Sequence, residues 1–327
     1  MCLGEIIGYC LQYSLLPIFV RARYIGHRVS HFFRFPTFSF LSTIMTDTED
    51  QQPRYPDLRG KVALITGIGQ VGPPNDDNWG NGAAISLALV RNGVKVFGCD
   101  INLAAAQRTK SRIEASVSGG VVDVMVADVT SSSAVEKFVQ ECMVKYGRID
   151  ILVNNVGRSE KGGPAEMPEE VWDAQVDINL KSVYLTCHVV LPIMESQGSG
   201  AVVNVSSVAG MRYVGKPQVA YAATKAAVTQ FTKHTAVMYA GKGVRLNAVL
   251  PGLMFTPLVH QLAEKYAAGD FEGLVATRHA QVPTGQMGTS TDVANAVVFL
   301  SSNIAARYLT GLKVVVDGGI VGSTGRT

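Results

Sequence analysis

The sequence predicts an α/β protein with a doubly wound parallel sheet, and three observations support this. From residue 61 onward, short runs rich in β-branched residues alternate with alanine-rich segments of helical period, which is typical of βαβ units. The runs are almost continuously apolar, as strands covered on both faces must be. No repeat or low-complexity linker interrupts the alternation. We therefore expect a Rossmann-like sheet of seven parallel strands with helices on both faces. The expected strands are 62–66, 95–99, 122–127, 149–154, 201–206, 245–250 and 313–316, and the expected helices are 83–92, 103–117, 131–146, 169–196, 219–241 and 290–302.

This body is expected to be a single domain at 61–327, preceded by an arm at 46–60 and a leader at 1–45. The leader carries four arginines and one acidic residue. Its arginine-rich, acid-poor composition fits a mitochondrial presequence, its apolar first half fits a membrane anchor, and Met45 fits a later start of translation. The expected location is cytoplasmic, or mitochondrial if the presequence is real, and a membrane is a partner only if the leader is an anchor.

Composition excludes several classes of function. The chain has 327 residues, of which 47% are hydrophobic, and its net charge is +3. The leader supplies that whole excess, so the other 282 residues hold 25 basic and 25 acidic side chains. A neutral body without a Lys/Arg tract argues against a nucleic-acid partner. The scattered cysteines form no CxxC pair or Cys/His cluster, so we expect no disulfide framework and no metal site.

A glycine-rich loop follows the first strand. A literal GxGxxG begins at Gly67, but two prolines follow its third glycine, and they cannot occupy a helix interior. Helical period starts only at Gly82. The glycines expected to approach a dinucleotide pyrophosphate at a helix N-terminus are therefore Gly67, Gly80 and Gly82, with 68–79 as an insertion.

Asp100 ends the second expected strand. A carboxylate there accepts hydrogen bonds from an adenosine ribose and repels a 2′-phosphate. At about 5 Å and an effective dielectric near 20, that repulsion costs roughly 3 kcal/mol. NAD(H) is therefore the expected cofactor, with NADP(H) as the alternative.

The motifs, taken together, resemble the short-chain dehydrogenase/reductase family from about residue 61 to residue 319. They occur in the family's order and are Thr66-Gly67 with Gly80-Asn81-Gly82, Asp128-Val129, Asn154-Asn155-Val156-Gly157, Asp177-Ile178-Asn179, Ser206-Ser207, Tyr221 and Lys225 as YxxxK, Pro251-Gly252 with Thr256, and Val316-Asp317-Gly318-Gly319. The insertion resembles the stretched loop of the divergent enoyl reductases, in which an aromatic residue also precedes the glycine, as Trp79 precedes Gly80 here. The YxxxK spacing instead resembles the ordinary branch of the family.

The resemblance implies a catalytic set and a cofactor set. The catalytic set is Asn179, Ser207, Tyr221 and Lys225; the cofactor set is Gly67, Gly80, Gly82, Asp100, Asp128, Val129, Asn155, Gly157, Tyr221, Lys225 and Thr256. Ser206 is the alternative to Ser207, because the gap to Tyr221 is one residue longer than is usual in the family.

Tyr221 and Lys225 are four residues apart and should share one helical face. An ammonium about 5 Å from a phenolate would lower the phenol's pKa by about two units. The resemblance further implies that Lys225 binds the nicotinamide ribose and that Asn179 holds a water in a proton relay.

These residues predict an NAD(P)-dependent oxidoreductase that interconverts a secondary alcohol and a ketone. A lid at about 253–288 should determine specificity. It is rich in apolar residues, and its Lys265 and Arg278 are opposed by three acidic residues. We therefore expect a largely apolar, uncharged substrate. The alternatives are a C=C (enoyl) reductase and a non-catalytic nucleotide sensor. Ordinary family members pair long helices into dimers and tetramers, and the alanine-rich stretch at 220–240 fits a homodimer or homotetramer.

Overall fold

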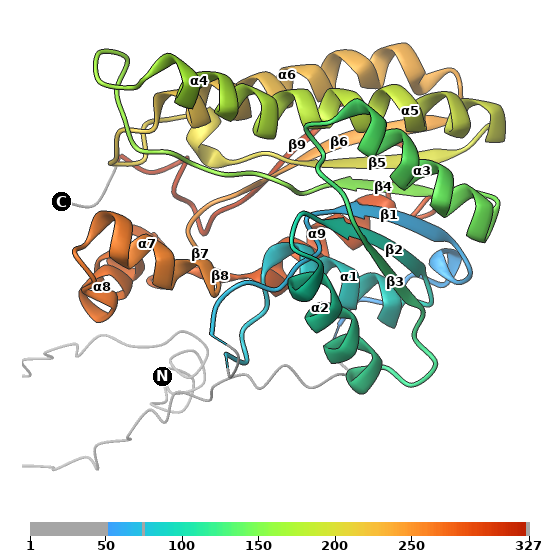
Figure 1. The fold of residues 1–327 in the computed structure, drawn as a ribbon, viewed down its shortest axis with the longest axis horizontal. Helices are drawn as coiled ribbons and strands as arrows, with labels where there is room; N and C mark the ends of the chain where they lie inside the picture. Colours follow the sequence, from blue (N-terminus) through green and yellow to red (C-terminus); the bar gives the residue numbers. More distant parts are fainter. Residues whose placement is uncertain (1–51, 74–75, 325–327) are drawn as a thin grey trace, which may run out of the picture. The chain divides into compact units, whose positions relative to one another are not determined.

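The computed structural model describes residues 52–73 and 76–324, so the predictions for the leader at 1–45 lie outside the described residues. The described chain forms one seven-stranded sheet with strand order β3-β2-β1-β4-β5-β6-β9, and every neighbouring pair is parallel (Figure 1). This confirms the predicted fold class. The strands are β1 (Val62–Thr66), β2 (Lys95–Asp100), β3 (Val122–Val126), β4 (Ile151–Asn154), β5 (Gly200–Val205), β6 (Val244–Pro251) and β9 (Lys313–Val316).

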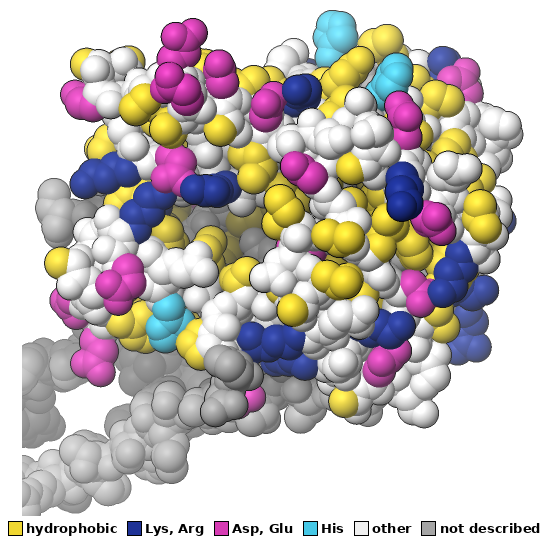
Figure 2. Space-filling model, in the orientation of Figure 1, with side chains coloured by type: hydrophobic (Ala, Val, Ile, Leu, Met, Phe, Trp, Pro, Cys, Tyr) yellow, Lys and Arg dark blue, Asp and Glu magenta, His cyan; other side chains and the backbone are white. Residues whose placement is uncertain are grey.

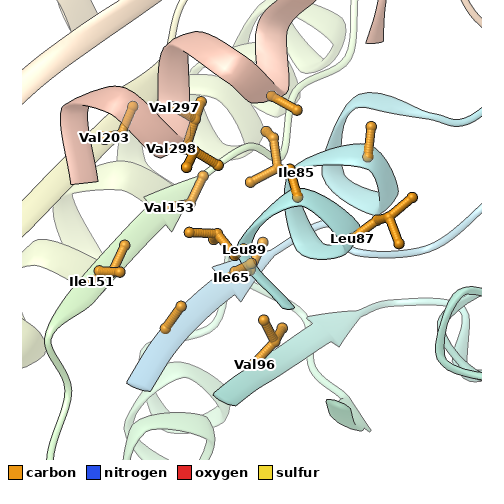
Figure 3. Packing of buried hydrophobic residues seen from close by; sticks show 14 of the residues in the cluster. Ile65, Ile85, Leu87, Leu89, Val96, Ile151, Val153, Val203, Val297 and Val298 are labelled. Atoms are coloured by element: carbon orange, nitrogen blue, oxygen red, sulfur yellow. The ribbon is translucent and has the colours of Figure 1, made fainter. Parts of the chain in front are cut away.

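Helices cover both faces of this sheet (Figure 1). On one face lie α1 (Asn81–Arg91), α2 (Leu103–Ser116) and α9 (Ser290–Ser301), and on the other lie α3 (Ser132–Tyr146), α4 (Glu169–Val176), α5 (Ser182–Gln197) and α6 (Val219–Ala240). Each face has its own apolar core. In the first core, side chains of α1 and α9 pack onto the central strands (Figure 3). The residues labelled there are Ile65, Ile85, Leu87, Leu89, Val96, Ile151, Val153, Val203, Val297 and Val298.

The packing of α1 matters for function because it fixes the start of that helix. Ile85 and Leu89 are completely buried, and Val297 and Val298 of α9 belong to the same cluster. Burying a side chain of this size contributes about 1.5–3 kcal/mol. The N-terminus of α1 is therefore held rigidly at the carboxyl end of β1.

The expected helix at 169–196 is not continuous. It is divided by a π-helical turn, η3 (Asp177–Lys181), that separates α4 from α5. Such turns are frequent at functional sites, and this one has Asn179 at its centre. The periodicity of the sequence did not reveal it, because one widened turn hardly disturbs the apolar pattern.

The segment expected to be a lid contains two short helices, α7 (Leu258–Tyr266) and α8 (Phe271–Gln281). Its ends are joined by a small parallel pair of strands, β7 (Met254–Phe255) and β8 (Gly288–Thr289). The sequence analysis identified neither the helices nor this pairing, since two-residue strands carry no periodic signal. Whether the segment acts as a lid stays a prediction. None of the helices within the described ranges combines the length and the hydropathy needed to cross a bilayer.

Candidate active site

Two adjoining cavities lie at the carboxyl end of the sheet. The first, called here the glycine-loop cavity, has a volume of about 300 Å³. The second, called the tyrosine cavity, has a volume of about 210 Å³ and contains Ser207, Tyr221 and Lys225. The two share Asn81, Asn155, Gly157, Thr256 and Leu258 along their common border. The structure brings together the predicted cofactor residues other than Tyr221 and Lys225 in the glycine-loop cavity, namely Gly67, Gly80, Gly82, Asp100, Asp128, Val129, Asn155, Gly157 and Thr256.

The glycine loop makes a close approach that only glycine allows. A Cβ on Gly82 would lie 2.1 Å from the carbonyl oxygen of Gly67 and 2.7 Å from Nδ2 of Asn155. Gly67 has a φ of 70°, in the left-handed region, and its carbonyl accepts a hydrogen bond from Asn155 Nδ2 at 2.9 Å. Helix α1 begins directly after Gly80, which has no side chain to cap it. The prediction that the helix starts only after the insertion is confirmed, and the first amides of α1 face the cavity without a capping side chain.

The described residues of the insertion, 68–73 and 76–79, are fastened to the rest of the chain by polar contacts. Gln70 is almost completely buried; its Oε1 accepts from the backbone N–H of Gly80 at 3.0 Å, and its Nε2 donates to the carbonyl of Asn78 at 2.8 Å. From α2, Arg108 donates to the carbonyl of Gly72, and Arg112 donates to that of Asp77. These contacts make the insertion a scaffold for the start of α1.

Asp100 has a second role that the sequence analysis did not foresee. Its Oδ2 accepts the backbone N–H of Gly69 at 2.9 Å, and its Oδ1 accepts that of Asn102 at 3.0 Å. A Cβ on Gly69 would lie 2.6 Å from Oδ2, so the contact requires glycine. Gly69, which is not in the expected cofactor set, therefore couples the glycine loop to Asp100. The literal GxGxxG was the available signal for it.

The tyrosine cavity places three predicted catalytic side chains together. Tyr221 and Lys225 come from adjacent turns of α6, and Lys225 Nζ lies 5.7 Å from the centre of the Tyr221 ring. Lys225 is 2% exposed, and its ammonium donates to the carbonyl of Val205 at 2.9 Å. Both serines after β5 border the cavity, but Ser206 Oγ is committed to the carbonyl of Lys225 at 2.7 Å. The geometry therefore favours Ser207, whose hydroxyl also interacts with Tyr221.

The expectation of a net lowering of the pKa of Tyr221 is wrong for this structure. Burial raises the pKa of the Tyr221 phenol, and the hydrogen bond with Ser207 only partly opposes that rise. Burial also lowers the pKa of Lys225 to about 8. The sequence argument counted the attraction between two charges but not their desolvation, which penalises both charged forms. Tyr221 consequently holds its proton at neutral pH and is suited to donate it.

Asn179 lies beside this group but lines neither cavity. Its side chain is completely buried; Oδ1 accepts the N–H of Arg158, and Nδ2 donates to the carbonyl of Arg158, both at 2.9 Å. A Cβ on Gly157 would lie 2.9 Å from Lys225 Nζ and 3.2 Å from Asn179 Oδ1. Asn179 thus fixes the loop after β4 against Lys225. The implied water relay stays a prediction.

Comparisons with known proteins match this geometry. A solved structure of a putative short-chain dehydrogenase/reductase from Burkholderia xenovorans superposes with a TM-score of 0.77 and 43% identity, covering 82% of this chain and 99% of that one. The chain belongs to the short-chain dehydrogenase/reductase family. A family model described as Enoyl-(Acyl carrier protein) reductase matches residues 77–321 of this dehydrogenase/reductase.

Two curated relatives extend the comparison. The 3-oxoacyl-(acyl-carrier-protein) reductase FabG of Thermotoga maritima is 37% identical over 265 residues, which is 81% of this chain and 99% of the relative. Levodione reductase of Leifsonia aquatica is 35% identical over 277 residues, which is 84% of this chain and 98% of the relative. This short-chain dehydrogenase/reductase is therefore an NAD(P)-dependent oxidoreductase.

The sequence analysis missed two cations in the tyrosine cavity of this dehydrogenase/reductase. Lys216 and Arg278 both line it, and Arg278 is only 8% exposed. The prediction that acidic lid residues oppose Lys265 and Arg278 is wrong for Arg278, with which no carboxylate of the described residues pairs. Lys265 is opposed by a carboxylate, but by that of Glu160 outside the lid segment. On the face shown in Figure 2, Lys and Arg side chains gather between α4 and α7.

Proposed function

We propose that this enzyme interconverts a ketone and a secondary alcohol with NAD(H), using Tyr221 as the proton donor and acceptor. The observation that carries the proposal is the shared border of the two cavities: Ser207, Tyr221 and Lys225 stand in one, and the glycine loop lines the other. A dinucleotide lying across that border would bring its reactive end beside the phenol.

The residues present fit such a cofactor. The close approach of Gly67 and Gly82 leaves backbone N–H groups of α1 open to a pyrophosphate. Asp100 would hold the adenosine ribose, and Asp128 with Val129 would border the adenine. When bound, the nicotinamide supplies the hydride that reduces the carbonyl carbon. The carboxylate of Asp100 supports NAD(H) over NADP(H), because a 2′-phosphate near it would be repelled.

The chain itself manages the substrate oxygen and one proton. Ser207 would hydrogen-bond that oxygen and orient it toward Tyr221. The phenol, kept protonated by its burial, then gives its proton to the developing alkoxide. The ammonium of Lys225 one turn away stabilises the phenolate that remains. In the oxidative direction, the same phenolate accepts the alcohol proton.

Reduction of a C=C bond is the second candidate. The description of the matching family model and the stretched glycine loop favour it. Against it, Tyr221 and Lys225 keep the spacing of the ordinary branch, and Trp79 lines neither cavity. Instead, the guanidinium of Arg112 lies 3.9 Å from the centre of the Trp79 ring.

Turnover of a substrate panel tests the proposal. Ketones, secondary alcohols and enoyl thioesters would each be assayed with NAD(H) and NADP(H), using wild type and Tyr221→Phe. We expect turnover of ketones and alcohols, a preference for NAD(H), and loss of turnover in the variant. Reduction of enoyl substrates alone, undiminished in Tyr221→Phe, would establish the second candidate instead.

We also propose that the enzyme is a homodimer or homotetramer that pairs through α5 and α6. Large apolar side chains are exposed there, with Tyr184 50%, Val237 74% and Met238 62% exposed. Light scattering of wild type and of Met238→Glu tests this. A monomeric wild type would contradict it.

A further inference from the structure

The tyrosine cavity has an unbalanced charge. Its lining includes Lys216, Lys225 and Arg278 but no aspartate or glutamate. Lys225 belongs to the proposed catalytic group, and its ammonium donates to the carbonyl of Val205. Lys216, from the loop before α6, and Arg278, from α8, have no such explanation.

Arg278 is buried without a hydrogen-bond or ion-pair partner among the described residues. Its side chain is 8% exposed, yet among the described residues it forms no hydrogen bond and no ion pair. It lies in the last turn of α8, where a cation is favoured, but its guanidinium donates to none of the described carbonyls there. A buried charge without a partner is costly, so its retention needs a reason outside the folded chain.

Other polar groups near Arg278 also lack a hydrogen bond. Lys216 has its ammonium 4.7 Å from the centre of the Tyr266 ring and forms no hydrogen bond within the described chain. The Tyr266 hydroxyl and Gln218 Oε1 are both buried without a hydrogen-bond partner, and Gln218 lines the same cavity. Burial and the nearby charge of Arg278 lower the pKa of Lys216 to about 8, so an anion would also relieve repulsion between these two cations.

We propose that Arg278 and Lys216 bind a carboxylate of the substrate, so that the enzyme acts on keto acids and the corresponding hydroxy acids. This rests on the proposed alcohol–ketone chemistry and replaces the expectation of an uncharged substrate. The planar guanidinium offers a carboxylate two parallel N–H donors, and Lys216 adds a second charge. Lys225 then stabilises the Tyr221 phenolate at the carbonyl end of the same substrate. The cavity volume of about 210 Å³ limits the substrate to a small acid.

Matched pairs of substrates test the carboxylate site. Oxo acids of increasing chain length would be compared with their methyl esters, using wild type, Arg278→Gln and Lys216→Gln. Wild type should prefer the acids, and Arg278→Gln should lose at least about thirtyfold in kcat/KM for acids, because a buried anion loses its charged partner. Turnover of the esters should change by less than about threefold in the same variant. Lys242→Gln is the control, since that lysine pairs with Glu195 on the surface.

A binding measurement separates this proposal from the proposed function. Short unreactive carboxylates should raise the melting temperature of the NAD-saturated wild type but not that of Arg278→Gln, whether or not any ketone is turned over. Arg278→Lys, which retains the charge, should keep part of the shift. Esters used as well as acids by wild type, or equal losses for both in Arg278→Gln, would overturn the carboxylate site. Failure of every ketone with a retained melting shift would instead overturn the proposed function.

Discussion

Replacing Gly82 by alanine should strongly weaken cofactor binding. The added Cβ would lie 2.1 Å from the carbonyl oxygen of Gly67, whereas ordinary contact begins at 3.4 Å, so the two segments must separate by more than 1 Å. Neither can yield easily: α1 is packed on α9, and Gly67 is tied to Asn155. Overpacking of this kind costs about 1–3 kcal/mol. A displacement of about 1 Å can also lower the reaction rate by about a hundredfold where reacting groups must be aligned.

Gly241→Ala is the matched control. No atom lies within 4 Å of the position that a Cβ there would take, its φ of −69° suits alanine, and it lines neither cavity. Titration with NADH should show affinity weakened by about tenfold to a hundredfold in Gly82→Ala and by less than about threefold in Gly241→Ala. Urea unfolding should show lower stability for Gly82→Ala. If the two variants bound NADH equally well, the close approach would not be what forms the site.

Three further predictions concern neighbouring residues. Asp100→Asn removes the charge but keeps an oxygen for the N–H of Gly69. The preference for NADH over NADPH, measured as the ratio of their kcat/KM values, should fall by about a hundredfold because the repulsion of the 2′-phosphate is lost. An unchanged ratio would exclude Asp100 as the source of the preference. Ser207→Ala should lower kcat by about a hundredfold or more. Ser206→Ala should mainly lower the free energy of unfolding, by about 1 kcal/mol, because its hydroxyl bonds the carbonyl of Lys225. Kinetics and urea unfolding measure the two effects, and the reverse pattern would identify Ser206 as catalytic. Burial lowers the pKa of Lys225 from 10.5 to about 8, so between these pH values the unfolded chain binds more protons than the folded one and the free energy of unfolding rises with pH. Lys225→Met should flatten that rise. If urea unfolding between these pH values gave the same slope for wild type and Lys225→Met, the lysine would not be buried.

Residues at the ends of strands and at helical spacing were predictable from the sequence. Gly67 and Ser207 follow strands and Asp100 ends one, and the carboxyl ends of these strands must meet at one edge of a parallel sheet. Tyr221 and Lys225 were implied by the family resemblance, and their spacing predicted that they share one face of a helix. The start of α1 was also predictable, because prolines exclude a helix directly after Gly72.

The remaining features depend on packing that no local pattern records. Lys216 and Arg278 reach the tyrosine cavity from a loop and from the lid segment, whose positions depend on tertiary contacts. The charge of Arg278 was therefore assigned to acidic partners that it does not have among the described residues, and Lys216 was overlooked. The pKa of Tyr221 was predicted in the wrong direction because desolvation can be judged only once burial is known.

Hydride transfer by Tyr221→Phe tests the central claim most directly. The variant keeps the ring and removes the hydroxyl that lies between Ser207 and Lys225 in the proposed chemistry. Single-turnover oxidation of NADH by a ketone should slow by at least about a thousandfold, while the affinity for NADH, measured by titration, should stay within about twofold of wild type. Undiminished single-turnover reduction of the ketone by Tyr221→Phe would show that the proton comes from elsewhere and would contradict the account.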